Sequence, residues 1–562
     1  MVSTSRMATL LRLKGGATSW MTQRASARTA LIARHMTTTA PSPSPETLAK
    51  LRDASSPVQL LSDGTMRIVQ LNREKALNAI NMDMIDLIEV ALADVVPSPN
   101  AATVLFRGVG RSICAGGDIM SLVKAANSDS QEKQMESVHF FQKELRQNWY
   151  VHTLRDKSSE LGHPKTYIGL WDGIIMGGGV GMTVHGSVRI ASERTLFAMP
   201  ETGIGYFPDV GLLHTFSRLD GAIGMYLGLT GARLSGADVY LTGLATHYVR
   251  SSSVDELVRR LSSMPIHSAA KEETIVEAIN EFASDPFQED EMLASKSVFL
   301  GDRRIALDFA FSRGSVEQIL AALDDMAQRR TDSYTGKELQ QRGLSLTDEI
   351  VSWASETHAT LLARSPRALK VTFRGIQLAR DQTLAENMHM NLRVATAFCD
   401  LSIGRDFYTG VMHVLGRDPK TGKRNEGNPA WEPSRVEDVS DEYIQTMFFG
   451  DHAKAQKAGL RLPLLTLDNV PAAPKNREGR QARDAEVRGV GPLRWNPKHN
   501  PHALPSEAEL AALYEGSHPA AGSYVLEPQE LLDTIAAYRH NKPTLRLKVQ
   551  DWLDRRARAS RS

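Results

Sequence analysis

Gly-Ile-Ile-Met-Gly-Gly-Gly-Val-Gly at residues 173–181 is the most informative segment of the chain. It is followed by Met-Pro-Glu-Thr at 199–202 and by Phe-Pro-Asp-Val-Gly at 207–211. Glycines carry no side chain, so their backbone N–H groups can approach a ligand closely. Two such donors aimed at one point can hold a thioester carbonyl oxygen as it becomes negative. The carboxylates Glu201 and Asp209 can then act as acid, base or nucleophile. The stretch therefore predicts an acyl-transfer site.

A phosphate-binding loop is the main alternative for a glycine-rich turn. The cluster at 177–181 lacks the Gly-x-Gly-x-x-Gly spacing, and no Gly-Lys-Ser/Thr follows it. The stretch from Gly416 to Arg424 is one residue too long for a phosphate loop and has Arg in place of Ser/Thr. Neither segment predicts nucleotide binding.

A second glycine turn, Ser-Ile-Cys-Ala-Gly-Gly-Asp-Ile at 112–119, follows a strand-like segment at 103–108 and opens a helix-like one. With Asn-Arg-Glu-Lys-Ala-Leu-Asn-Ala at 72–79 and the triple glycine, it resembles the crotonase (enoyl-CoA hydratase/isomerase) superfamily. The Met-Pro-Glu-Thr and Phe-Pro-Asp-Val-Gly motifs are similar to its 3-hydroxyisobutyryl-CoA hydrolase branch. The resemblance runs from about Val58 to Phe449, and its later landmarks are Ser365–Lys370, Asp406–Val411 and Asn428–Trp431.

This resemblance implies an α/β fold, a crotonase-like spiral of ββα units with a helical C-terminal cap. It places the two oxyanion-hole amides at Gly117 and Gly178. It assigns the acyl site to Glu201, Asp209 and Glu144. It also implies that CoA lies along Lys75, Ala76 and Leu77, with the cationic Lys75 near the nucleotide end.

Gly181 separates the reactions within the superfamily. Enoyl-CoA hydratases resemble this chain but carry a second glutamate there, so the resemblance favours thioester hydrolysis over hydration. A lone Glu201 can activate water, or attack the thioester to give an anhydride that water opens. Asp209 can bond a substrate 3-hydroxyl or place water, and the sequence leaves these routes open.

A purely structural role is the alternative for each acid, and it weighs most for Glu144. Its surroundings depart from the family, because Lys143 replaces a common acid and an insertion is expected within 149–162.

Charge is segregated along the 562-residue chain, although the net charge is only +1. Residues 1–45 carry six Lys/Arg and no Asp/Glu, with interspersed apolar and Ser/Thr residues, which is typical of a mitochondrial transit peptide. No apolar run is long enough to span a bilayer. Cys114 and Cys399 are the only cysteines, so neither a disulfide framework nor a metal site is expected.

Five regions are predicted: a transit peptide at 1–38, a linker at 39–55, a crotonase-like acyl-CoA-binding core at 56–253, a helical cap region at 254–450, and a basic extension at 451–562. Residues 451–562 carry 18 Lys/Arg against 13 Asp/Glu. Helices are expected at 506–515 and 528–538, the first with a capping box made by Ser506 and Glu509, and residues 545–558 mix apolar with basic side chains. Two interpretations of the extension remain, a solvated basic tail or an amphipathic arm that docks on a partner or on RNA.

Two functions from different classes follow. The resemblance implies a mitochondrial matrix enzyme of valine catabolism that hydrolyses an acyl-CoA, with CoA as part of the substrate, no separate cofactor and no metal. Relatives of this branch also occur in the mitochondrial small ribosomal subunit, so a structural or dual role is the alternative. Association with that subunit, homo-oligomer formation and acyl-chain selectivity are left open.

Overall fold

The structure is a computed structural model, and it describes residues 44–417, 421–450, 460–468, 502–518 and 524–561. The chain divides into two units, residues 1–50 and 51–562. Helix α2 (Pro45–Arg52) is the described part of the first unit and lies within the predicted linker. The predicted transit peptide at 1–38 lies outside the described residues. The remaining described elements belong to the second unit.

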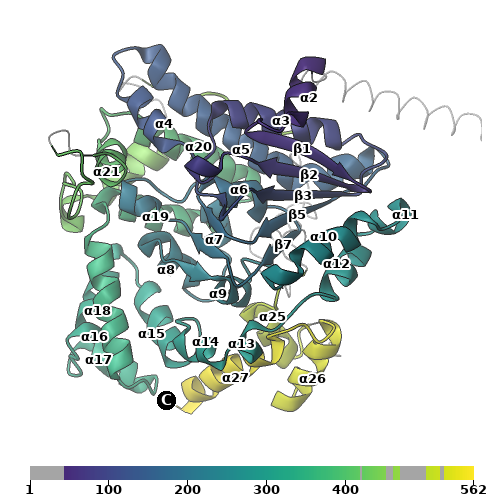
Figure 1. Ribbon diagram of the computed structural model, residues 1–562. Coiled ribbons are helices and arrows are strands. Elements are labelled where there is room, and N and C mark those ends of the chain that lie inside the picture. Colours follow the sequence, from purple (N-terminus) through teal and green to yellow (C-terminus); the bar gives the residue numbers. More distant parts are fainter. Residues whose placement is uncertain (1–43, 418–420, 451–459, 469–501, 519–523, 562) are drawn as a thin grey trace, which may run out of the picture. The chain divides into compact units, whose positions relative to one another are not determined.

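Two sheets form the centre of the second unit (Figure 1). The larger has the order β1-β2-β3-β5-β7-β10, with β1 Val58–Asp63, β2 Met66–Leu71, β3 Thr103–Gly108, β5 Thr166–Trp171, β7 Val188–Ala191 and β10 His247–Tyr248. The smaller has the order β4-β6-β8-β9, with β4 Ser112–Cys114, β6 Ile174–Met176, β8 Leu196–Ala198 and β9 Leu234–Ser235. Only the β1–β2 and β8–β9 pairs are antiparallel.

From β3 to β8, consecutive strands alternate between the two sheets, and this alternation produces the spiral. The pairs β3/β4, β5/β6 and β7/β8 each give one strand to the larger sheet and the next to the smaller. The core helices are α3 Met82–Val95, α4 Ile119–Ala126, α5 Gln131–Glu160, α6 Gly178–Val184, α7 Leu212–Phe216, α8 Ile223–Thr230 and α9 Gly236–Leu241, with 3-10 turns η1 Glu74–Ala76 and η2 Glu201–Ile204. The predicted ββα organisation is confirmed.

One face of the larger sheet packs against helices that follow it in the chain. Leu105, Ile168 and Ile190 from the strands share a buried cluster with Leu257 of α10 and Ile275 of α12. Full burial of each such side chain contributes about 1.5–3 kcal/mol. Although α10 and α12 fall within the predicted cap region at 254–450, they cover the sheet itself.

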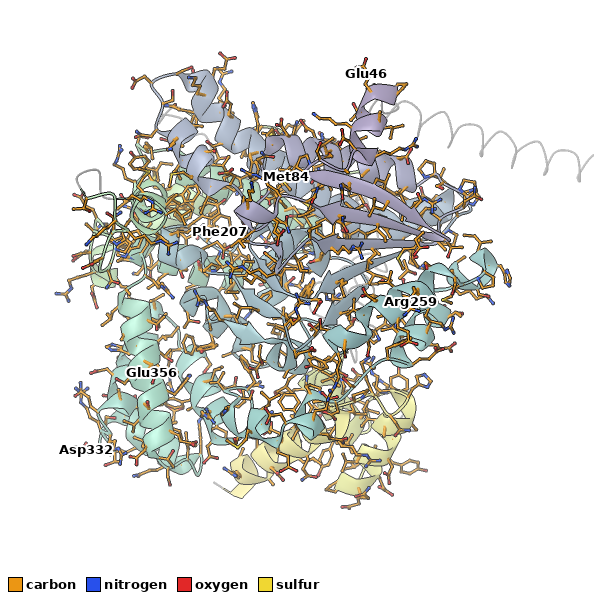
Figure 2. All side chains as sticks on the ribbon, viewed as in Figure 1. Glu46, Met84, Phe207, Arg259, Asp332 and Glu356 are labelled. Carbon is orange, nitrogen blue, oxygen red and sulfur yellow. The ribbon has the colours of Figure 1, made fainter. Side chains whose placement is uncertain are left out.

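The region from 254 to 450 is helical, as predicted. Its elements are η3 Ser251–Ser253, α10 Val254–Ser262, α11 Ile266–Ala269, α12 Glu272–Asn280, α13 Pro286–Glu289, α14 Glu291–Lys296, α15 Gly301–Phe311, α16 Val316–Ala327, α17 Tyr334–Gln341, α18 Asp348–Leu362, α19 Pro366–Ala379, α20 Leu384–Cys399, α21 Asp406–Val414, η4 Val436–Asp438, α22 Asp441–Ile444 and the π-turn η5 Gln445–Phe449. Local sequence determines where four of these helices begin, because a side-chain oxygen caps the first turn of each. The capping residues are Ser315, Thr347, Ser365 and Thr383. Phe207 points into the interior, whereas Arg259 and Glu356 lie at the surface (Figure 2).

The C-terminal extension adds α25 (Glu507–Tyr514), α26 (Pro528–Tyr538) and α27 (Leu545–Arg561), which lie beside α13–α15 (Figure 1). Leu510, Leu531 and Val549 are fully buried. Ser506 caps α25, but the Glu509 side chain pairs with Arg539 at 2.6 Å, so the predicted reciprocal capping box is wrong. Residues 469–501 of the extension lie outside the described residues.

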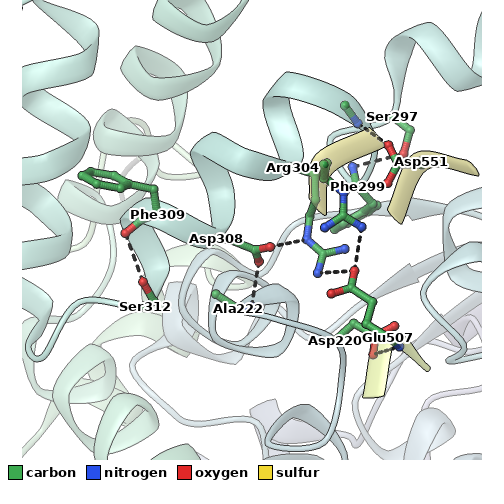
Figure 3. A network of polar contacts seen from close by, with 12 residues as sticks. Asp220, Ala222, Ser297, Phe299, Arg304, Asp308, Phe309, Ser312, Glu507 and Asp551 are labelled. Atoms are coloured by element: carbon green, nitrogen blue, oxygen red, sulfur yellow. Dashed lines mark hydrogen bonds and ion pairs between the residues drawn. The ribbon is translucent and has the colours of Figure 1, made fainter. Parts of the chain in front are cut away.

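Ion pairs bind the extension to the cap and to the core, and Figure 3 shows those around Arg304 and Glu507. Glu507 contacts Arg304 of α15 at 3.0 Å and Arg555 of α27 at 2.7 Å. Lys548 contacts Asp220 at 3.0 Å. Since the Arg304 and Lys548 side chains are only 3% and 9% exposed, the expectation of a solvated basic tail is wrong for the described helices.

Two expectations from the sequence concern the segment at 149–162 and membrane-spanning helices. Residues 149–160 continue helix α5, so the expected insertion within 149–162 lengthens a helix and makes no loop. Among the described residues, no helix is long and apolar enough to cross a bilayer.

Candidate active site

The two predicted glycine turns meet in the structure. Gly116 has φ +107° and Gly177 has φ +48°, backbone conformations that favour glycine. A Cβ added to Gly177 would lie 3.2 Å from the Gly116 Cα, so the two main chains touch where side chains would separate them.

The amides of Gly117 and Gly178 lie next to this contact. A Cβ on Gly178 would be 3.8 Å from the Gly117 amide nitrogen. Within the described residues, neither amide donates a hydrogen bond to a protein acceptor. Gly178 is also the first residue of α6, where the helix dipole favours negative charge. Two open donors on fixed backbone can receive an oxyanion without reorganisation.

The segment at 72–80 is bonded directly to the first turn. Ile80 donates its N–H to the Gly116 carbonyl at 2.9 Å, and Asp118 donates to the Ile80 carbonyl at 2.7 Å. Leu77 has φ +50° and its carbonyl accepts from Ala115 at 3.0 Å.

The predicted CoA-contacting residues therefore border the first glycine turn. Lys75 is exposed, while Ala76 and Leu77 are half-buried. Arg73, which was not singled out from the sequence, pairs with Asp118 at 3.1 Å. The role of Lys75, Ala76 and Leu77 in CoA binding stays a prediction.

Glu201, Asp209 and Glu144 converge on the second turn from three elements. Glu201 begins η2 and is 7% exposed, Asp209 is 6% exposed, and Glu144 lies on α5 and is 3% exposed. A Cβ on Gly177 would lie 3.3 Å from Glu201 Oε1, and one on Gly178 would overlap Glu144 Oε1. Glu144 Oε1 and Glu201 Oε2 are buried without a hydrogen-bond partner among the described residues. Buried polar atoms normally have partners, so these two indicate a ligand position.

Burial and mutual repulsion determine how these acids titrate. Burial, and then the charges of Asp209 and Glu201, raise the pKa of Glu144 well above its usual range. Burial and the charge of Asp209 raise the pKa of Glu201 likewise. Burial raises the pKa of Asp209 to about 7, although a hydrogen bond from Tyr206 opposes the shift. Burial therefore disfavours negative charge on all three acids, and the hydrogen bond from Tyr206 favours it on Asp209.

The chain around Glu201 and Asp209 is held by buried contacts. Thr202 donates its hydroxyl to the Leu229 carbonyl at 2.9 Å, and its own carbonyl accepts from the Ser365 N–H at 3.2 Å. After Asp209, Val210 has φ +48°, a strained conformation for a β-branched residue. The Val210 carbonyl bonds His185 Nε2 at 2.7 Å.

Val210 occupies the space beside Gly181. A Cβ on Gly181 would lie 2.5 Å from the Val210 Cβ and 3.0 Å from Asn148 Nδ2. The position where hydratases carry a second glutamate therefore has no room for a side chain in this packing.

Sequence reasoning missed two polar residues of the site. Asn148 is buried on α5, four residues after Glu144 and so on the same helical face. Tyr206 is also buried, and its hydroxyl contacts Asp209 Oδ2 at 3.2 Å. The i, i+4 spacing signals Asn148, but no local pattern identifies Tyr206.

The comparisons with known proteins agree with this geometry. A family model described as enoyl-CoA hydratase/isomerase matches residues 66–448. The chain belongs to this family. Among solved members, a carnitinyl-CoA dehydratase from Mycobacterium thermoresistibile has a TM-score of 0.56 and 27% identity, covering 74% of this chain and 100% of that one. An enoyl-CoA hydratase from Rhodobacter sphaeroides, with a TM-score of 0.53 and 24% identity, supports the fold. The predicted α/β spiral with its helical cap is confirmed.

Relatives within the enoyl-CoA hydratase/isomerase family have two kinds of name. A protein from Xenopus tropicalis named 3-hydroxyisobutyryl-CoA hydrolase, mitochondrial, is 36% identical over 69% of this chain and 88% of its own length. The 3-hydroxyisobutyryl-CoA hydrolase 1 of Arabidopsis thaliana is 33% identical over 75% of this chain and 97% of its own length. The small ribosomal subunit protein mS47 of Neurospora crassa is 33% identical over 66% of this chain and 67% of its own length.

Proposed function

We propose that this chain is a thioester hydrolase that converts 3-hydroxyisobutyryl-CoA to 3-hydroxyisobutyrate and CoA in valine catabolism. The observation that carries the proposal is the position of Glu201. Its buried carboxyl places Oε1 beside Gly177 and leaves Oε2 without a hydrogen-bond partner among the described residues, and the packing of Val210 closes the place of a second hydratase glutamate at Gly181. The names of the hydrolase relatives support this substrate.

In the proposed mechanism the thioester oxygen binds between the amides of Gly117 and Gly178. The negative charge that develops there when the carbonyl is attacked is stabilised by both donors. Glu201 either takes a proton from the attacking water or attacks the carbonyl itself, and the geometry is compatible with both routes. Either role requires the Glu201 carboxylate, which burial and Asp209 disfavour in the empty site. Hydrolysis should therefore speed up as pH rises above neutral.

Asp209 and Glu144 complete the proposed acyl site. Asp209 bonds the substrate 3-hydroxyl or orients water, and Glu144 Oε1 faces the Gly178 backbone where the acyl group would lie. CoA extends past Leu77 toward Lys75. No separate cofactor and no metal is part of the proposal, because CoA belongs to the substrate.

The proposed location is the mitochondrial matrix. Mitochondrial location is supported by the names of the Xenopus tropicalis and Danio rerio relatives.

A second candidate role is that of a component of the mitochondrial small ribosomal subunit, favoured by the likeness to mS47. The ion pairs of Arg304, Glu507, Arg555 and Lys548 reduce the free basic charge that such a role would use. Sedimentation of the endogenous protein on a sucrose gradient separates the two roles. Comigration with small subunits through a salt wash would favour the ribosomal role.

The chemistry is tested with Glu201→Gln, which keeps the side chain's size and removes its ionisation. CoA release from 3-hydroxyisobutyryl-CoA should fall by about 10²–10⁴-fold, the usual contribution of a positioned acid or base. Glu160→Gln, at an exposed position on α5, is the matched control and should retain wild-type turnover. Wild-type protein that hydrates crotonyl-CoA faster than it hydrolyses 3-hydroxyisobutyryl-CoA would refute the proposal.

A further inference from the structure

Tyr206 is enclosed by aromatic rings from the core and the cap. Its ring stacks on Phe141 of α5 at a centroid distance of 5.3 Å and on Phe407 of α21 at 4.6 Å. Phe398 of α20 meets it edge to face at 5.3 Å. Aromatic pairs of this kind contribute beyond simple area burial. The ring of Tyr206 is therefore fixed by three elements that converge only in the folded protein.

The hydroxyl of Tyr206 makes the three site carboxyls unequal. It donates a hydrogen bond to Asp209 Oδ2 at 3.2 Å. Glu144 Oε1 and Glu201 Oε2 have no such partner among the described residues. A hydrogen bond to an ionised acceptor is stronger than one between neutral groups, so it favours negative charge on Asp209.

We propose that Tyr206 is a positioning residue, which holds the Asp209 carboxyl in place and makes Asp209 the group that carries the negative charge of the empty site. This inference rests on the proposed function only for its kinetic test. It assigns Tyr206 no contact with the substrate.

The groups around the hydrogen bond explain why a single hydrogen-bond donor can determine which of the three carboxyls becomes negative. Asp209 interacts electrostatically with Glu201 and Glu144, and the Cys399 thiol lies near Asp209 and Tyr206. All of these groups become negative when they lose a proton, so ionisation of one opposes the next. The carboxyl that receives the donor consequently ionises first, and the other two remain protonated to a higher pH.

Tyr206→Phe tests this reasoning, because it keeps the stacked ring and removes only the donor. A hydrogen bond to a charged group is worth enough to shift ionisation by about one to two pH units. The charge of Asp209 then no longer opposes ionisation of Glu201, so the acidic limb of the kcat/KM profile should move downward by up to this amount, with KM nearly unchanged. Tyr167→Phe is the matched control, since Tyr167 is also buried but donates to the Met182 carbonyl at 2.8 Å. Its pH profile should overlay that of the wild type.

A second probe is independent of turnover and of the Phe variant's folding. In full-length protein with 3-fluorotyrosine in place of Tyr206, the ¹⁹F resonance should titrate with Asp209, and Asp209→Asn should abolish this titration. The more acidic fluorophenol is the better donor and favours the charge on Asp209, which opposes ionisation of Glu201, so the kinetic limb should move upward.

The possible failures are distinguishable. Wild-type protein without CoA release would refute the proposed function, while the ¹⁹F titration would still test the role of Tyr206. Active protein whose pH profile is the same with Tyr, Phe and 3-fluorotyrosine at position 206 would overturn the inference about Tyr206. A ¹⁹F resonance that does not titrate would overturn it as well.

Discussion

Gly178→Ala is expected to abolish most CoA release without disturbing the fold. The added methyl group would overlap Glu144 Oε1 and lie 3.8 Å from the Gly117 amide nitrogen. It therefore displaces the Glu144 carboxyl and crowds the space between the two amides. The backbone tolerates the change, because Gly178 is the first residue of α6 and its φ is not positive.

The size of the loss follows from what the methyl group obstructs. Removing one oxyanion-hole donor typically lowers kcat by about 10²–10³, equivalent to about 2.7–4 kcal/mol of transition-state stabilisation. Displacement of Glu144 acts on the same transition state, so the two effects are not additive. We expect at least a ~10²-fold loss, with thermal stability unchanged or slightly increased, because Ala favours a helix over Gly by up to ~1 kcal/mol.

Gly117→Ala provides the comparison. A Cβ at Gly117 would lie 3.3 Å from the Phe140 ring, which needs to shift by only a few tenths of an ångström. Its kcat should fall less than about tenfold, well below the effect of removing a donor. CoA release is followed with a thiol reagent, and thermal unfolding is measured on the same samples. Gly178→Ala with turnover within about threefold of the wild type would refute the placement of the oxyanion hole.

Three further outcomes are expected. Glu507→Gln should lower the free energy of unfolding in denaturant by about 3–5 kcal/mol, because it leaves buried Arg304 short of a partner. Burial alone would raise the pKa of Glu507, but Arg304 and Arg555 lower it to about 2. The stabilisation that the Glu507 carboxylate contributes to the fold should therefore be complete above pH ~4.5 and disappear toward pH 2, in the wild type only. Gly181→Glu should destabilise the fold by about 1–3 kcal/mol through overpacking against Val210, without creating crotonyl-CoA hydration; a stable, hydrating variant would contradict the packing. Burial, with Arg539 nearby, lowers the pKa of Lys542 to about 7, and this lysine lines a cavity of about 530 Å³. Acetic anhydride at pH 7 should therefore label Lys542 before Lys165, whose amine donates to the carbonyls of Ser98 and His163. Equal labelling of the two lysines by mass spectrometry would contradict this.

Local patterns were sufficient to predict many elements. The helix at 528–538 and the strand at 103–108 have the predicted bounds, because periodicity and turn residues are read within each segment. The two glycine turns and the three acids also come together as predicted. Their spacing in the sequence corresponds to a repeated ββα topology that the family shares.

What the sequence did not predict depends on contacts between distant segments. Tyr206 is positioned by rings on α5, α20 and α21, and no local pattern records that convergence. The basic residues of α27 resemble a solvated tail until their partners, Asp220 and Glu507, are placed. For the same reason Glu509 forms an ion pair with Arg539 in place of the capping box that its spacing suggested.

The cap can reach its final structure only after the helices α25–α27 have been synthesised. The N–H at Gly301, where α15 begins, donates to Asp551 at 2.7 Å, across 250 residues. Until α25–α27 have emerged, Arg304 lacks Glu507, and the apolar faces later covered by Leu531 and Val549 remain in water. Domains generally fold from the N-terminus during synthesis, and exposed apolar surface promotes aggregation. A nascent chain, or one truncated before α25–α27, should therefore depend on chaperones, because its cap lacks the contacts that the extension supplies.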